Sequence, residues 1–102
     1  EMAYGPTTPE ADVKLCKRGI PVVPDILANA GGVTGSYFEW SQNLQGVHWT
    51  EEEVLKKLKP IMVQSFNQVW DKAAKHGVDL RTGAYILAID RIARAMKLRG
   101  RV

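Results

Sequence analysis

Residues 50–77 read TEEEVLKKLKPIMVQSFNQVWDKAAKHG, and this stretch does most to decide the fold. Thr50 and Glu53 form a capping box, in which each side chain accepts a backbone hydrogen bond at a helix start. Pro60 predicts a kink or a break inside the helix, and Gly77 predicts its end. Apolar residues recur at the three-and-four spacing of one buried helix face, at Leu55, Leu58, Met62, Phe66, Val69 and Ala73.

The first 25 residues predict a helix, a short strand and the start of a second helix. Thr8 is a good N-cap, Pro9 suits the first helical position, and the helix should end near Gly19. Residues 20–24, IPVVP, predict a short strand at a sheet edge, because proline lacks the backbone N–H that a central strand donates. Asp25 is then expected to cap the second helix.

Small residues interrupt this second helix, and a last helix follows residue 77. Residues 29–33, NAGGV, form the interruption, and helical character resumes over residues 37–40, YFEW. A glycine within a helix costs about 1 kcal/mol relative to alanine, so two of them need a reason. Either a ligand approaches the backbone or helices pack closely there. The last helix begins near Asp79 or Arg81, ends at Gly100, and carries on one side Tyr85, Ile89, Ile92 and Met96.

Composition restricts the classes of function. The 102 residues allow one small domain or part of a larger one, and 45% hydrophobic residues argue against disorder. The net charge of +3 is too small for the dense basic patch of most nucleic-acid-binding proteins, and no apolar run reaches the roughly 20 residues of a membrane span. The single cysteine, Cys16, allows no internal disulfide and is predicted to be a half-buried helix thiol. We therefore expect a cytoplasmic protein, or a mitochondrial one in a eukaryote, that binds neither nucleic acid nor membrane.

Several motifs, in order and with matching spacing, resemble those of one enzyme family. They are GPTTPEAD at residues 5–12, PDILANAGGVT at 24–34, SYFEW at 36–40 and LRTGAY at 80–85. The pattern resembles the glutamate dehydrogenases, within the glutamate, leucine, phenylalanine and valine dehydrogenase family. The resemblance implies a C-terminal segment of such an enzyme, mainly α with one or two short strands. Residues 1–28 would be the tail of an α/β Rossmann-type nucleotide-binding domain, and residues 29–102 the C-terminal helices that return from it.

The resemblance also implies an activity and a set of contacts. The family converts L-glutamate reversibly to 2-oxoglutarate and ammonia with NAD or NADP, usually as a hexamer, so a homo-oligomer is expected. Val33 and Ser36 would line the substrate pocket, with Ser36 hydrogen-bonded to the side-chain carboxylate. Asn29 would lie near the nicotinamide carboxamide. Tyr4 stands where the family usually has a second asparagine near the nicotinamide, and a phenol does not offer the paired donor and acceptor of an amide.

The chain lacks parts that the reaction requires. It has no Gly-x-Gly-x-x-Gly fingerprint, and no lysine stands in the glycine-rich context of the family's catalytic lysine. His48 and His76 are isolated, and neither has a second candidate ligand at the spacing that a metal site requires. A solvated helix face explains the remaining lysines of residues 50–77, which are Lys56, Lys57, Lys59, Lys72 and Lys75.

Three hypotheses remain from the sequence. The chain is a segment of an amino-acid dehydrogenase that is inactive alone, or a helical module that associates with itself without catalysis. The third is a basic helical module for nucleic acid, which rests on the cationic stripe at the C-terminal end, and the negative end of the helix dipole explains most of that stripe.

Overall fold

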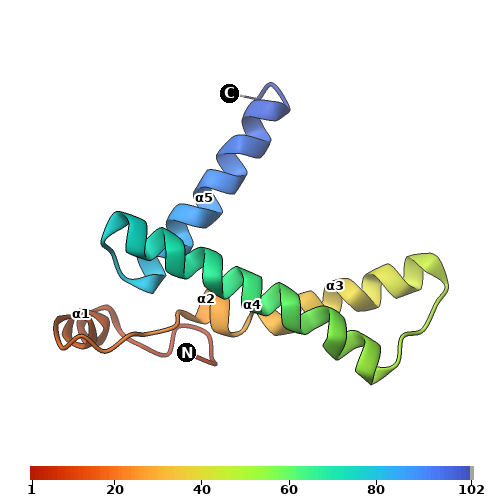
Figure 1. Cartoon of the computed structure of the whole chain (residues 1–102), viewed down its shortest axis with the longest axis horizontal. Coiled ribbons are helices and arrows are strands. Elements are labelled where there is room, and N and C mark those ends of the chain that lie inside the picture. The colour runs from red at the N-terminus through yellow and green to blue at the C-terminus, as the bar shows by residue number, and fades with distance from the viewer. Residues whose placement is uncertain (102) are drawn as a thin grey trace.

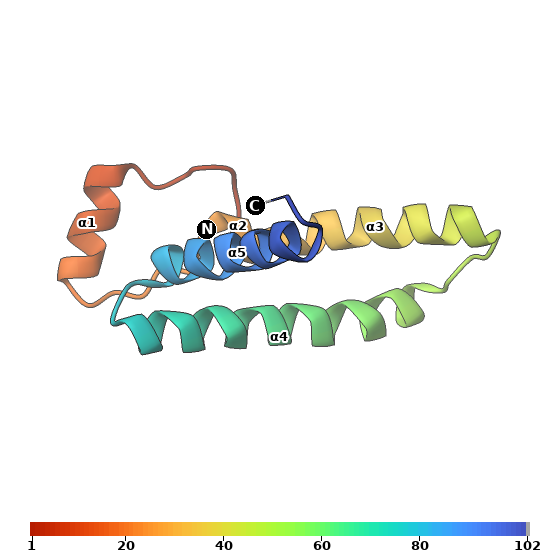
Figure 2. The same ribbon diagram turned by 90° about the horizontal axis from the view of Figure 1, so that it is seen from above.

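The computed structural model describes residues 1–101, and its regular structure is helical throughout that range (Figure 1). The helices are α1 (Pro9–Lys17), α2 (Asp25–Ala28), α3 (Ala30–Gln45), α4 (Glu51–His76) and α5 (Leu80–Leu98). α3 and α4 run side by side in opposite directions, α5 crosses the end of α4 and projects away from it, and α1 lies at one end of the molecule (Figures 1 and 2).

The predicted ends of the long helix are confirmed. The Glu53 backbone N–H donates to Thr50 Oγ1 at 3.3 Å, and the Thr50 N–H donates to Glu53 Oε2 at 2.8 Å, which completes the capping box. Gly77 ends α4 in the left-handed conformation that glycine adopts without strain. The alternative of a break at Pro60 is wrong, because α4 continues through it. A proline removes one backbone hydrogen bond, and the other hydrogen bonds of this 26-residue helix keep it continuous.

The core is small and lies where α2, α4 and α5 meet. Its fully packed apolar side chains are Leu27, Val69, Ala73, Leu80 and Ala84. A close approach of α4 and α5 depends on Gly83, where a Cβ would lie 2.9 Å from Ala73 Cβ and 3.0 Å from the Val69 carbonyl oxygen. Phe38 is buried farther along α3, where its ring meets Trp49 edge-on.

Two fold predictions are wrong for the described residues. Residues 20–24 form no strand, and no Rossmann-type α/β portion is present in residues 1–101, which are mainly helical. A strand exists only by pairing with a second strand, and the described chain supplies no partner segment beside this one. Pro21 and Pro24 also remove two of the donors that pairing would use. The predicted division between residues 28 and 29 falls at the end of α2 and stays a prediction.

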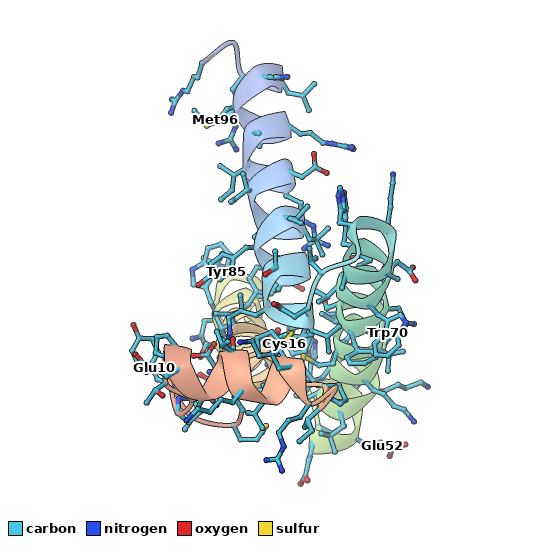
Figure 3. All side chains as sticks on the ribbon, turned by 90° about the vertical axis from the view of Figure 1, so that its left-hand side faces the viewer. Glu10, Cys16, Glu52, Trp70, Tyr85 and Met96 are labelled. Atoms are coloured by element: carbon cyan, nitrogen blue, oxygen red, sulfur yellow. The ribbon has the colours of Figure 1, made fainter. Side chains whose placement is uncertain are left out.

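The molecule is more open than a compact protein of its length. Its radius of gyration is 16.4 Å, whereas about 13 Å is typical of a compact domain of this size. Its accessible surface is 7858 Å², against about 5,800 Å² for a compact protein of this mass. Much of the excess comes from apolar faces of α3 and α5, which are Val33, Tyr37, Trp40 and Leu44 on α3 and Tyr85, Ile89, Ile92 and Met96 on α5. Met96 lies near the projecting end of α5 (Figure 3).

Candidate functional site

The predicted substrate residues Val33 and Ser36 and the predicted cofactor residue Asn29 lie on one exposed side of α3 and its N-cap. Asn29 is the single turn residue between α2 and α3, so the interruption in the helix is shorter than the predicted residues 29–33. Val33 and Ser36 follow four and seven positions later, which places all three on the same side of the helix. Asn29 and Ser36 are exposed, and Val33 keeps 70% of its surface accessible. The face therefore combines an apolar wall with two polar groups.

The glycines of this helix leave open space where a Cβ would lie. A Cβ added at Gly31, Gly32 or Gly35 would meet no heavy atom within 4 Å outside its own turn. The alternative of tight helix packing is thus not realised within residues 1–101. The open backbone surface fits a ligand or a further protein element at this face.

Tyr4 lies in an N-terminal loop that is bonded to the start of α2. Its side chain is 96% exposed. The next residue, Gly5, donates its backbone N–H to Asp25 Oδ2 at 2.8 Å. Asp25 accepts a second bond through its backbone carbonyl oxygen, from the Asn29 N–H at 2.9 Å. The structure therefore connects the loop of Tyr4 and the turn of Asn29 through one residue.

Asp25 does not have the predicted N-cap position. Pro24 is the N-cap of α2, and Asp25 is its first helical residue. Asp25 as a whole residue is 8% exposed. Its carboxylate also accepts the Ile26 N–H through Oδ1, at 2.8 Å. The two carboxylate oxygens of Asp25 therefore accept backbone N–H groups from Ile26 and from Gly5, and the side chain does not cap the helix.

Arg81, at the start of α5, is surrounded by three carboxylates. Its Nη2 donates to Glu1 Oε2 at 2.6 Å, its Nε donates to Asp12 Oδ2 at 3.2 Å, and its Nη1 lies 3.6 Å from Asp25 Oδ1. Glu1 Oε2 also accepts the Asp25 backbone N–H at 2.9 Å. We call these four residues the Arg81 cluster. It joins the N-terminal loop, α1, α2 and α5 at one point.

The contacts of the cluster shift the pKa values of Glu1 and Arg81. Hydrogen bonding from the Thr7 side chain, and next from Arg81, lowers the pKa of the Glu1 carboxyl to about 2. Hydrogen bonding to Glu1 is also the main cause that raises the pKa of Arg81 above its ordinary value. Both shifts favour the charged forms, so Glu1 and Arg81 remain ionised at neutral pH.

Sequence reasoning missed this cluster. Glu1 and Arg81 are 80 positions apart, and nothing in the local pattern of either pairs them. The sequence indicates Arg81 as a helix start and as part of the motif LRTGAY, and Asp25 as a helix cap and as part of the motif PDILANAGGVT, but neither as half of an ion pair. The one available signal was the occurrence of a charged residue inside each of these apolar or turn-rich motifs.

An apolar pocket of about 410 Å³ lies between α1, residues 19–22 and the junction of α4 and α5. Cys16 and Trp70, both labelled in Figure 3, contribute to its wall. The prediction of a half-buried Cys16 is wrong, since this thiol is exposed. α1 makes few contacts with the other helices, so its inner side remains accessible.

Other predicted surface residues are mostly where the sequence placed them. His48 and His76 are exposed, and residues 1–101 hold no group of three or more side chains arranged to bind a metal ion. Of the lysines assigned to a solvated face, Lys72 is partly buried and forms an ion pair with Asp90 at 3.4 Å, whereas the other four are exposed. Among the helices of the described range, none has the length and hydropathy that crossing a membrane requires.

Comparison with known proteins identifies the family. The model of the glutamate/leucine/phenylalanine/valine dehydrogenases matches residues 1–100. The chain belongs to this family. It is 60% identical over 100 residues to a glutamate dehydrogenase of Thermotoga maritima and 54% identical over 100 residues to an NAD-specific glutamate dehydrogenase of Clostridioides difficile. Each match covers 98% of this chain and 24% of the relative.

Solved dehydrogenases of the family share the fold. The glutamate dehydrogenase of Peptoniphilus asaccharolyticus superimposes with a TM-score of 0.93 at 50% identity, over 98% of this chain and 25% of the other. A hetero-hexameric glutamate dehydrogenase of Thermus thermophilus, in a leucine-bound form, gives a TM-score of 0.86 at 39% identity, over 90% of this chain and 22% of the other. The chain thus spans about a quarter of the length of its relatives.

Proposed function

We propose that this chain is the segment of an NAD-dependent glutamate dehydrogenase that forms one wall of the substrate site, and that it does not catalyse the reaction alone. The observation that carries the proposal is the exposed face of α3, on which Asn29, Val33 and Ser36 share one side next to an open glycine surface. Curated relatives described as NAD-specific favour NAD over NADP.

In this proposal each residue of the α3 face has one task. Val33 packs against the methylene groups of L-glutamate, and the Ser36 hydroxyl donates to its side-chain carboxylate. Asn29 and Tyr4 contact the carboxamide side of the nicotinamide ring. The fit to such a group rests on the exposed Asn29 amide, the exposed Tyr4 hydroxyl and the open glycine surface in the first turns of α3. When bound, NAD supplies the hydride acceptor, and the contribution of this chain is to place the substrate against it.

The shape of the chain supports a role inside a larger assembly. Its accessible surface exceeds that of a compact protein by about 2,000 Å², which is comparable to a large protein interface. Exposed apolar stripes of this kind mark surfaces that another protein element covers. We extend the proposal to a homo-oligomeric enzyme in the cytoplasm, with sedimentation of the complete protein as the measurement of its assembly state.

The first measurement is the intact mass of the purified protein under denaturing conditions. A mass several times 11.4 kDa means that these residues belong to one longer enzyme, which can be assayed directly. A mass near 11.4 kDa calls for a chimera in which the chain replaces the matching quarter of the Thermotoga maritima enzyme. NAD reduction that depends on L-glutamate is then followed by absorbance.

The decisive variant is Ser36→Ala, with Ser41→Ala as its matched control. Both remove one hydroxyl from α3, and Ser41 accepts only a local bond from Gln45 Nε2 at 2.9 Å. The Michaelis constant for glutamate should rise about tenfold or more in Ser36→Ala, the cost of a lost hydrogen bond to a charged group, and stay within twofold in Ser41→Ala. An active chimera in which both variants behave alike would exclude the assigned role of Ser36.

A further inference from the structure

Asp25 connects the two segments to which the proposed function assigns the nicotinamide. Through Oδ2 it accepts the Gly5 N–H at 2.8 Å, and Gly5 directly follows Tyr4. Through its backbone oxygen it accepts the Asn29 N–H at 2.9 Å. A displacement of Asp25 therefore moves the loop of Tyr4 and the turn of Asn29 together. Val33 and Ser36 lie one and two turns farther along α3, held by the helix's own hydrogen bonds.

Asp25 itself depends on Arg81. The two side chains are 3.6 Å apart, and Glu1 Oε2 joins them a second time, because it accepts both the Asp25 N–H and Arg81 Nη2. The Asp25 and Glu1 side chains are only 11% and 4% exposed. Two poorly hydrated carboxylates this close repel one another unless a cation lies between them. The guanidinium, whose donors point in fixed directions, supplies that charge and also reaches Asp12.

The rest of the described chain does little to hold the N-terminal loop. Met2 and Tyr4 are 81% and 96% exposed, so apolar packing contributes little there. The Glu1 backbone nitrogen also lies 2.9 Å from the carbonyl oxygen of Val23, in the segment that leads into α2. The position of Tyr4 is therefore set by polar bonds at residues on either side of it, Glu1 and Gly5.

We propose that Arg81 is a positioning residue for the cofactor side of the site, which acts through Asp25 and Glu1 to fix Tyr4 relative to Asn29. The inference rests on the proposed function, because only that function assigns Tyr4 and Asn29 to the nicotinamide. Arg81 itself touches neither substrate nor cofactor in this assignment. It sits on α5, so the position of this helix is coupled to the geometry of the nicotinamide contacts.

The first test measures, in the 102-residue chain and independently of activity, whether the Arg81 cluster holds the N-terminal loop in place. Amide hydrogen exchange is followed by NMR in Arg81→Met and in Lys72→Met, which removes the other ion pair between elements but leaves the Arg81 cluster intact. Exchange at Gly5 should be at least about tenfold faster in Arg81→Met and unchanged in Lys72→Met, while exchange at Ala84 in the core stays the same in both. Unchanged exchange at Gly5 in a folded Arg81→Met overturns the inference. Should Arg81→Met not fold, Asp25→Asn replaces it, because this isostere weakens the acceptor for Gly5 with little change in packing.

The second test uses the active enzyme or chimera described above. Arg81→Met should raise the Michaelis constant for NAD at least about fivefold and leave that for glutamate within twofold, the opposite of the pattern expected for Ser36→Ala. Arg81→Lys, which keeps the charge but not the fork of donors, should recover part of the loss. If the parent enzyme is inactive, the proposed function fails. If it is active and Arg81→Met raises both Michaelis constants alike, the proposed function stands and the positioning role fails.

Discussion

Gly83 gives the sharpest test of how α4 and α5 pack. A Cβ at this position would lie 2.9 Å from Ala73 Cβ and 3.0 Å from both the Ala73 nitrogen and the Val69 carbonyl oxygen. Carbon atoms in ordinary contact are about 3.5–4.0 Å apart, so the two helices must separate to admit the methyl group. Overpacking of this kind costs about 1–3 kcal/mol. Replacement of a helical glycine by alanine recovers about 1 kcal/mol of helix propensity, which leaves Gly83→Ala about 1 kcal/mol less stable than the parent.

Gly35→Ala is the matched control for this substitution. It makes the same chemical change within α3, where the new Cβ meets nothing within 4 Å. This variant should be about 1 kcal/mol more stable than the parent, since only the propensity changes. The difference of about 2 kcal/mol between the two variants then measures the interhelical clash alone.

Urea denaturation followed by circular dichroism at 222 nm measures this difference. With a denaturant slope of about 1–3 kcal/mol per molar urea, the two midpoints should lie about 1 M apart. Equal stability of Gly83→Ala and Gly35→Ala would refute the close approach of the two helices at Gly83, and with it the packing of α5 on α4.

Three further predictions concern local interactions. Thr50→Ala removes the N-cap of α4 and should cost about 1 kcal/mol, whereas Thr50→Asp should retain most of the stability in the same urea assay. Pro60→Ala restores a backbone donor inside α4 and should raise stability by about 1–3 kcal/mol; a loss of stability would show that the proline is required for the path of the helix. The pKa of Glu1 is lowered from 4.5 to about 2 in the folded chain, so its contribution is complete above pH 4.5 and is lost as the pH falls toward 2. Thermal unfolding at several pH values should therefore show a difference in stability between the parent and Glu1→Gln that narrows over this range, and a difference independent of pH would contradict the lowered pKa that Thr7 and Arg81 give Glu1.

Comparison of α1 with the segment that follows it shows which features can be predicted from sequence. α1 begins after Thr8, whose Oγ1 accepts the Ala11 N–H at 3.3 Å, and it ends just before Gly19, as the local residues indicate. The strand expected at residues 20–24 is absent from the described chain, although its residues favour an extended backbone. A helix supplies its own hydrogen-bond partners within four residues, whereas a strand needs a partner from elsewhere.

The candidate site divides in the same way. Resemblance identified Asn29, Val33 and Ser36 from the sequence, and their roles stay proposals. Their shared face exists because α3 is helical from Ala30, where the sequence predicted an interruption over residues 29–33. The Arg81 cluster could not be predicted, because its members come from four separate segments. The apolar spacing along α5 did not reveal what surrounds that side of the helix either, since Ile89 and Ile92 are 62% and 61% exposed despite their apolar side chains.

By itself the sequence determined the family, the helix starts at Thr8 and Thr50, and the helix end at Gly77. Capping and helical periodicity act within four residues and do not depend on the rest of the chain. The tertiary structure alone decided that Gly83 approaches Ala73, that α5 exposes Ile89 and Ile92 to solvent, and that Glu1 pairs with Arg81. These outcomes depend on which segments come together in space, and spacing along the chain does not encode contacts between residues 80 positions apart.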